Sequence, residues 1–126
     1  MLKKVLVVED STTMRSLITS TIEEIPELTV IAVGNGFEAL KVLPQQTFDL
    51  IITDINMPDI NGLEIVNFVK NHPSYRTIPM IIVSTEQSEE DIQKGLALGA
   101  SAYVTKPFNP DELRKTVQGV LKSSGH

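Results

Sequence analysis

Strand-like and helix-like segments alternate along the whole chain, and this alternation limits the fold more than any other feature of the sequence. The strand-like segments are short apolar runs rich in β-branched residues: Val5–Val8, Thr29–Val33, Leu50–Thr53, Met80–Val83 and Ala102–Thr105. Several are apolar at nearly every position, which is typical of parallel strands buried on both faces. The pattern predicts an α/β fold, in which a doubly wound, five-stranded parallel sheet carries five helices on its two faces.

Residues that cap helices mark where the predicted helices begin. The last four helices are each preceded by Asn or Ser, with an acidic residue three positions later: Asn35 and Glu38, Asn61 and Glu64, Ser88 and Asp91, Asn109 and Glu112. These pairs resemble capping boxes. The first helix is expected to begin near Ser11 and to stop at Pro26, because proline interrupts helical hydrogen bonding.

Composition restricts the classes of protein to which the chain can belong. Its 126 residues are 41% hydrophobic and 21% charged, which predicts a single globular domain over residues 1–126. The absence of cysteine excludes disulfides and thiolate metal sites. A formal net charge of −5 argues against a nucleic-acid partner. No apolar run resembles a membrane span or a signal peptide, so we expect a cytoplasmic location without membrane contact.

Polar side chains follow four of the five predicted strands. They are Glu9 and Asp10, Asp54, Ser84, and Lys106. Because the carboxyl ends of parallel strands meet at one edge of the sheet, these side chains should converge there, where α/β sheets bind ligands. Carboxylates so close together repel one another, and oxygen ligands suit a hard cation, Mg²⁺ in particular. His72 and His126 are expected to lie away from this site.

Four segments together resemble the receiver domain of two-component response regulators, and most of all its single-domain, CheY-like members. They are "VLVVED", "DLIITDINMPDINGLE", "IPMIIVST" and "GASAYVTKPF". The resemblance covers essentially the whole chain. It implies a flavodoxin-like sheet with the strand order 2-1-3-4-5.

The resemblance also implies the roles of the residues at this edge. Asp54 would be the phosphoacceptor, and Lys106 and Ser84 would contact the phosphoryl oxygens. Mg²⁺ would be bound by Asp10, Asp54 and the backbone carbonyl of Asn56, and by Glu9 through water. Glu9 replaces the commoner Asp of the family, and Ser84 replaces the commoner Thr.

A second set of residues would tune and transmit the signal. Tyr103 matches the aromatic switch of the family, and Thr85 stands where a smaller residue is common. Asn56 and Glu86 occupy positions that tune the attack of water on the phosphoryl group. The bond between Lys106 and Pro107 would be cis, as in the family.

The expected function is phosphorelay signal transduction, with chemotaxis as one pathway among several. The donor would be a phosphohistidine on a sensor histidine kinase or phosphotransfer protein, or else acetyl phosphate. The receiver would catalyse only its own phosphorylation and slow dephosphorylation, and so would not be an enzyme in the usual sense. As a monomer, it would signal to a protein target through a surface formed by the fourth helix, the fifth strand and the fifth helix.

Two other classes share part of this pattern. A haloacid-dehalogenase-like phosphatase also uses an Asp nucleophile and Mg²⁺, but its D-x-D motif lies on the first strand, whereas Asp54 and Asn56 follow the third. A flavodoxin-like flavin binder would need a phosphate loop at Ser11–Thr13, and Glu9 and Asp10 would repel a phosphate there.

Overall fold

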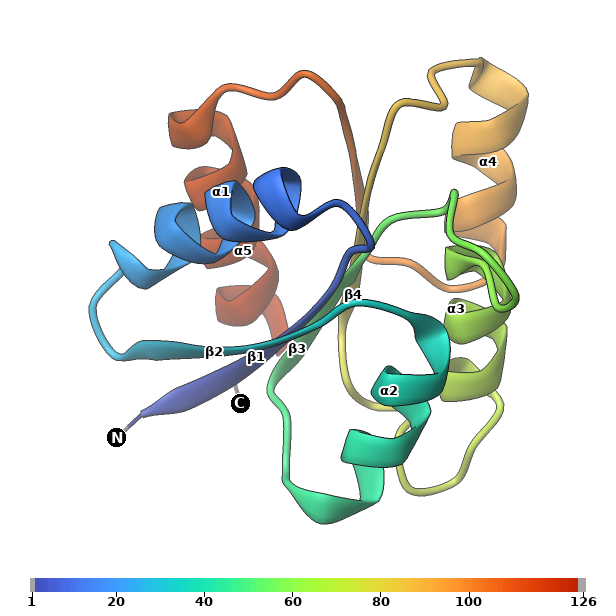
Figure 1. Ribbon diagram of the computed structural model, residues 1–126, viewed down its shortest axis with the longest axis horizontal. Helices are drawn as coiled ribbons and strands as arrows, with labels where there is room; N and C mark the ends of the chain where they lie inside the picture. The colour runs from blue at the N-terminus through green and yellow to red at the C-terminus, as the bar shows by residue number, and fades with distance from the viewer. Residues whose placement is uncertain (1, 125–126) are drawn as a thin grey trace.

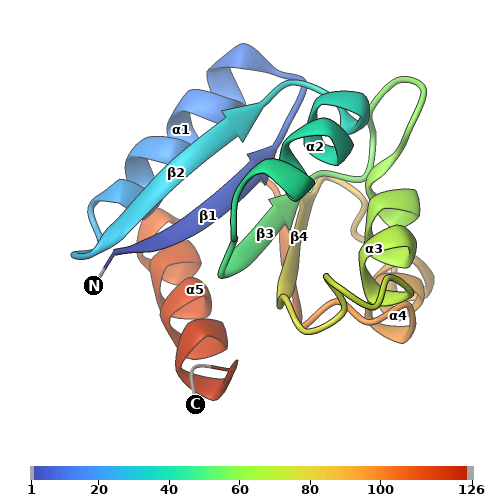
Figure 2. The same cartoon turned by 90° about the horizontal axis from the view of Figure 1, so that it is seen from below.

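The computed structural model describes residues 2–124, which form a three-layer α/β structure around one parallel sheet (Figure 1). The sheet has five strands in the order β2-β1-β3-β4-β5, as predicted, and Figure 2 shows β2, β1, β3 and β4 side by side. Their bounds are β1 Lys3–Val8, β2 Leu28–Val33, β3 Leu50–Thr53, β4 Met80–Ser84 and β5 Ala102–Thr105. The strands match the predicted apolar runs to within two residues at each end.

The helices divide between the two faces of the sheet. They are α1 Thr12–Glu23, α2 Gly36–Val42, α3 Gly62–Lys70, α4 Glu89–Ala97 and α5 Pro110–Ser124, with a short 3-10 helix, η1 Leu43–Gln45, after α2. Figure 1 shows α1 and α5 on one face and α2, α3 and α4 on the other. The short helix η1, with Pro44 near its start, was not predicted.

Alternation along the strands supplies both hydrophobic layers. In β1, Val5 and Val7 pack toward α1 and α5, whereas Leu6 and Val8 pack toward α2 and α3. All four side chains are fully buried. The continuous apolar run therefore predicted a buried strand correctly, because both faces of a doubly wound sheet need apolar residues.

The predicted caps are present at α2, α3 and α4, but only α3 has the full capping box. Asn61 and Glu64 form a complete capping box at α3, with each side chain accepting from the other residue's backbone N–H. Asn35 and Ser88 cap α2 and α4 through the backbone N–H three residues later. Asn109 instead accepts from the N–H of Asp111, two residues later, so its predicted pairing with Glu112 is wrong.

The register of the sheet brings the carboxyl ends of the strands together. Val8 lies opposite Thr53, Thr53 opposite Ile82, and Ser84 opposite Thr105. Consequently, the residues that follow β1, β3, β4 and β5 emerge at one edge.

Two further predictions concern other parts of the chain. His72 follows α3, at the opposite edge, where its ring stacks on Tyr75 with the centroids 4.3 Å apart. His126 lies outside the described residues. Over residues 2–124, no helix has the length and apolar character needed to cross a membrane.

Candidate functional site

Three carboxylates converge at the carboxyl edge of the sheet. Glu9 and Asp10 follow β1, Asp54 follows β3, and one oxygen from each lies within 4.8 Å of the others. Glu9 is 1% exposed and Asp54 is 7% exposed, whereas Asp10 is open to solvent. The cluster is therefore buried on one side and accessible on the other.

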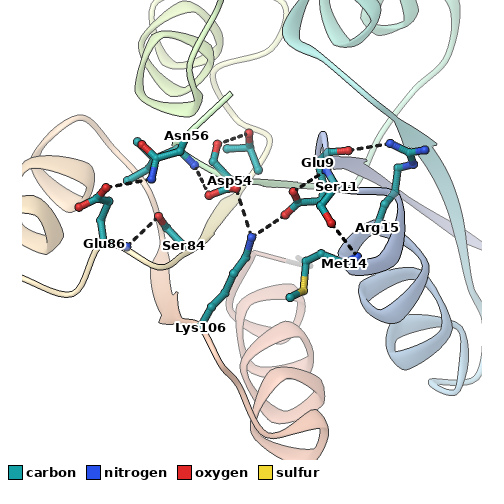
Figure 3. Close-up of polar contacts among 11 residues, drawn as sticks. Glu9, Ser11, Met14, Arg15, Asp54, Asn56, Ser84, Glu86 and Lys106 are labelled. Carbon is teal, nitrogen blue, oxygen red and sulfur yellow. Dashed lines mark hydrogen bonds and ion pairs between the residues drawn. The ribbon is translucent and has the colours of Figure 1, made fainter. Parts of the chain in front are cut away.

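The ammonium group of Lys106 offsets part of this negative charge. Its Nζ donates to Glu9 Oε1 at 2.7 Å and to Asp54 Oδ2 at 3.2 Å, and so lies between the two side chains (Figure 3). Burial acts to lower the pKa of Lys106, but the hydrogen bond to Glu9 and the charges of Asp54 and Glu9 outweigh it and raise the pKa above its ordinary value. Lys106 therefore stays charged beside Asp54.

In Glu9, unlike in Lys106, the effect of burial on the pKa is larger than the effect of its partners. Burial raises the pKa of its carboxyl group, and the hydrogen bonds from Lys106 and from the backbone N–H of Ser11 only partly counter this effect. The Ser11 N–H donates to Oε2 at 3.1 Å, so each oxygen of Glu9 has a partner within the protein. Glu9 is one methylene longer than the Asp that is common in the family, and its carboxylate contacts Lys106 directly.

Backbone contacts fix the position of Asp54. The N–H of Ile55 donates to Asp54 Oδ1 at 2.7 Å, and the Thr53 hydroxyl donates to the Asp54 carbonyl at 2.9 Å. Gly62 packs directly against that carbonyl, since a Cβ added there would lie 1.8 Å from its oxygen. Only glycine allows α3 to begin this close to Asp54.

A polar rim surrounds the side of the site formed by β4. Ser84 is fully buried, and its hydroxyl accepts from the N–H of Glu86 at 3.1 Å. The side-chain amide of Asn56 donates to Glu86 Oε1 at 2.9 Å, across the gap between the loops after β3 and β4 (Figure 3). Thr85 is exposed.

The loop after β4 also connects the site to β5. The hydroxyl of Tyr103 donates to the backbone carbonyl of Glu86 at 2.6 Å, and burial raises its pKa. Gln87 donates to the carbonyl of Lys106 at 2.8 Å. The following peptide bond, between Lys106 and Pro107, is cis.

The donor set suits a hard cation. Glu9, Asp10 and Asp54 offer only oxygen atoms, and these three carboxyl groups face the single positive charge of Lys106. Mg²⁺ is commonly held by one or two carboxylates with water completing its shell, and exposed Asp10 leaves room for that water. The residues present therefore fit Mg²⁺.

Comparison with known proteins identifies the family. The sequence model of the response regulator receiver domain matches residues 5–118. The chain is a response regulator receiver domain. The receiver is 37% identical to a chemotaxis protein CheY homolog of Campylobacter jejuni over 119 residues, which cover 94% of the receiver and 92% of that protein. It is 35% identical to the chemotaxis protein CheY1 of Helicobacter pylori, with coverage of 94% and 96%.

Solved structures agree with this assignment. The receiver superposes on Vibrio cholerae chemotaxis protein CheY4 with a TM-score of 0.88 and 38% identity, covering 95% of the receiver and 99% of that chain. The receiver domain of the Francisella response regulator 1452 gives a TM-score of 0.88 and 30% identity, covering 97% and 98%. The matches do not favour the phosphatase or flavin-binding alternatives.

Each acidic and basic side chain of the cluster was predictable from the sequence, but some of their partners were not. Arg15 donates from Nη1 to the backbone carbonyl of Glu9 at 2.9 Å, and Gln87 contacts the backbone of Lys106. The position of Arg15, one helical turn after Ser11, is the only local signal that could have found it. Gln87 gives no such signal, because its contact joins two distant loops.

Proposed function

We propose that this receiver accepts a phosphoryl group on Asp54 in a Mg²⁺-dependent reaction and transmits the event to a partner protein. The observation that carries the proposal is the contact of a buried Asp54 carboxylate with the Lys106 ammonium, beside two further carboxylates. A carboxylate held by a fixed backbone and next to a cation is positioned to attack an anionic phosphate.

The transfer exchanges one bond to phosphorus for another. A carboxylate oxygen of Asp54 attacks phosphorus while the P–N bond of a donor phosphohistidine breaks, and the leaving imidazole takes up a proton. With acetyl phosphate, a P–O bond breaks and acetate leaves. Lys106 offsets the charge on the phosphoryl oxygens, and the Ser84 hydroxyl donates to one of them after its contact with Glu86 opens.

The metal would be held by Asp10, Asp54 and the backbone carbonyl of Asn56, with Glu9 acting through water. When bound, Mg²⁺ supplies positive charge that stabilises the transferring phosphoryl group. Glu9 and Lys106 keep each other in place on the side of the site away from solvent.

Dephosphorylation would depend on Asn56 and Glu86, at the rim of the site. Asn56 and Glu86 join across the mouth of the site, where water must approach Asp54. We expect slow hydrolysis of the aspartyl phosphate, so the receiver turns over only its own modification and acts as a signalling protein. Its composition suits a cytoplasmic monomer, over residues 1–126, that is phosphorylated by a sensor histidine kinase or phosphotransfer protein.

The output would pass through α4, β5 and α5. The Tyr103 hydroxyl donates to the carbonyl of Glu86, whose N–H donates to Ser84 at the end of β4, so a shift of Ser84 toward the phosphoryl group changes the support of the Tyr103 ring. A Tyr103→Ala variant should accept phosphoryl groups but lose most of a coupling of about 1–3 kcal/mol to the partner surface. Chemical shifts with and without beryllofluoride test this, and a mutant response equal to that of the wild type contradicts it.

The proposed function is tested by phosphorylation with acetyl phosphate in the presence and absence of Mg²⁺. Wild-type receiver should be labelled only with Mg²⁺, and Asp10→Asn should need about tenfold more metal or more. Labelling that is independent of Mg²⁺ would contradict the proposal. Steady turnover of a model phosphate ester would point to the phosphatase instead.

A further inference from the structure

Arg15 makes a contact with the metal-site backbone that the proposed mechanism does not use. It lies on α1, one turn after the capping Ser11, and its Nη1 donates to the backbone carbonyl of Glu9 at 2.9 Å (Figure 3). The Glu9 N–H donates to the carbonyl of Val33 at 3.1 Å. Arg15 therefore restrains the backbone at the point where β1 turns toward Asp10.

The surroundings of Arg15 leave space for its guanidinium group. A Cβ added to Gly34 would lie 3.1 Å from Arg15 Nη1, so the guanidinium would have to move by a few tenths of an ångström. The N–H of Gly34 donates to Glu38 Oε1 at 2.8 Å, which fixes the glycine in turn. The loop after β2 thus forms one wall of the place where Arg15 lies.

The charge of Arg15 and its hydrogen bond predict opposite effects on a metal. Within residues 2–124 no carboxylate forms an ion pair with Arg15, although Glu38 Oε1 and Arg15 Nη1 both lie beside Gly34. A positive charge near the cluster repels Mg²⁺, and its loss alone would tighten binding. A hydrogen bond that orients a ligand-bearing loop strengthens binding, and its loss would weaken it.

We infer that Arg15 is a positioning residue of the metal site, which fixes the Glu9 carbonyl and so the direction in which the Asp10 ligand leaves β1. The inference rests on the proposed function, because it requires that Glu9, Asp10 and Asp54 bind Mg²⁺. The hydrogen bond from Arg15 strengthens Mg²⁺ binding by more than the positive charge of Arg15 weakens it.

Calorimetric titration with Mg²⁺ tests this inference on two variants that lose the same charge. Arg15→Met should weaken Mg²⁺ binding about tenfold. Arg76→Met is the matched control, because Arg76 is exposed at the opposite edge of the sheet, and it should bind Mg²⁺ as the wild type does. Arg15→Lys, which keeps the charge and one donor, should recover part of the affinity. Equal or tighter binding by Arg15→Met overturns the inference.

A second variant tests the same geometry without touching Arg15. Gly34→Ala should crowd the guanidinium and weaken Mg²⁺ binding in the same direction, with altered backbone amide shifts at Asp10 and Ser11. Unchanged Mg²⁺ affinity and unchanged amide shifts would overturn the inference. A variant that loses only thermal stability, with the same Mg²⁺ affinity, would overturn it too. If the wild type itself binds no Mg²⁺, the proposed function fails and the inference fails with it. If the wild type binds Mg²⁺ and the variants bind it equally well, the inference fails but the proposed function survives.

Discussion

The buried Lys106 and the partly buried Lys70 lie at opposite edges of the sheet and have different partners. Lys106 lies between the carboxylates of Glu9 and Asp54 at the carboxyl edge. Lys70 ends α3 near the other edge, where its Nζ donates to the backbone carbonyls of Ile78 at 2.6 Å and Arg76 at 3.2 Å. Burial lowers the pKa of Lys70, whereas the neighbouring carboxylates raise that of Lys106.

The difference separates a lysine that closes a loop from a lysine that lies in the proposed phosphorylation site. Backbone carbonyls have no net charge, so Lys70 closes a loop without creating a site that attracts another ion. The three carboxylates around Lys106 carry more formal negative charge than its single positive charge offsets, as the proposed cation site requires. The partners of a buried charge, rather than its burial, indicate which edge of the sheet is functional.

Removal of the Lys106 charge should have the largest effect on stability. Lys106→Met leaves two buried carboxylates without their cation, and we expect the free energy of unfolding without Mg²⁺ to fall by about 3 kcal/mol or more. Added Mg²⁺ should restore part of this loss. Urea unfolding with and without Mg²⁺ measures both, and a loss below about 1 kcal/mol would show that the carboxylates do not depend on Lys106.

Glycines near the two edges extend the comparison. Gly62→Ala places a methyl group against the Asp54 carbonyl and should cost about 3 kcal/mol, because backbone must move. Gly99→Ala should cost less, about 1–2 kcal/mol, although its φ is +120°. The atom that an added Cβ would meet is the Cγ of the flexible Lys70 side chain, at 2.8 Å. Thermal unfolding ranks the pair, and the reverse order would contradict this account.

Loss of the Lys70 charge should have the smallest effect. Lys70→Met removes two hydrogen bonds but also a buried charge, so we expect a loss of about 1 kcal/mol or less at pH 7, with unchanged Mg²⁺ affinity. Because the folded-state pKa of Lys70 is lowered, the unfolded state binds more protons as pH approaches 10.5, and wild-type stability should rise relative to the mutant. Urea unfolding between pH 8 and 10.5 checks the sign, and a difference that shrinks with pH would contradict it.

The fold was predictable because the relevant signals are local. Apolar runs such as Val5–Val8 indicate buried strands, and Asn61 with Glu64 marks a helix start. The charged cluster was predictable as well, because parallel topology alone brings Asp10 and Asp54 to one edge.

The missed contacts depend on how side chains reach between distant segments. The hydrogen bonds from Arg15 to the Glu9 carbonyl and from Tyr103 to the Glu86 carbonyl appear only when neighbouring loops are in place. The same holds for Lys70, whose carbonyl partners lie in the loop before β4. Asn109 departs from prediction for a local reason, since its side chain bonds to Asp111 in the first turn of α5.

The assignment of Asp54 as phosphoacceptor is tested most directly by locating the phosphoryl group. Wild type and Asp54→Asn would be treated with acetyl phosphate and Mg²⁺, reduced with borohydride to convert an aspartyl phosphate into homoserine, and sequenced by mass spectrometry. We predict homoserine at position 54 in the wild type and no labelled carboxylate in Asp54→Asn, which should keep its fold. Homoserine at position 10, or labelling of the folded mutant equal to that of the wild type, would contradict the assignment.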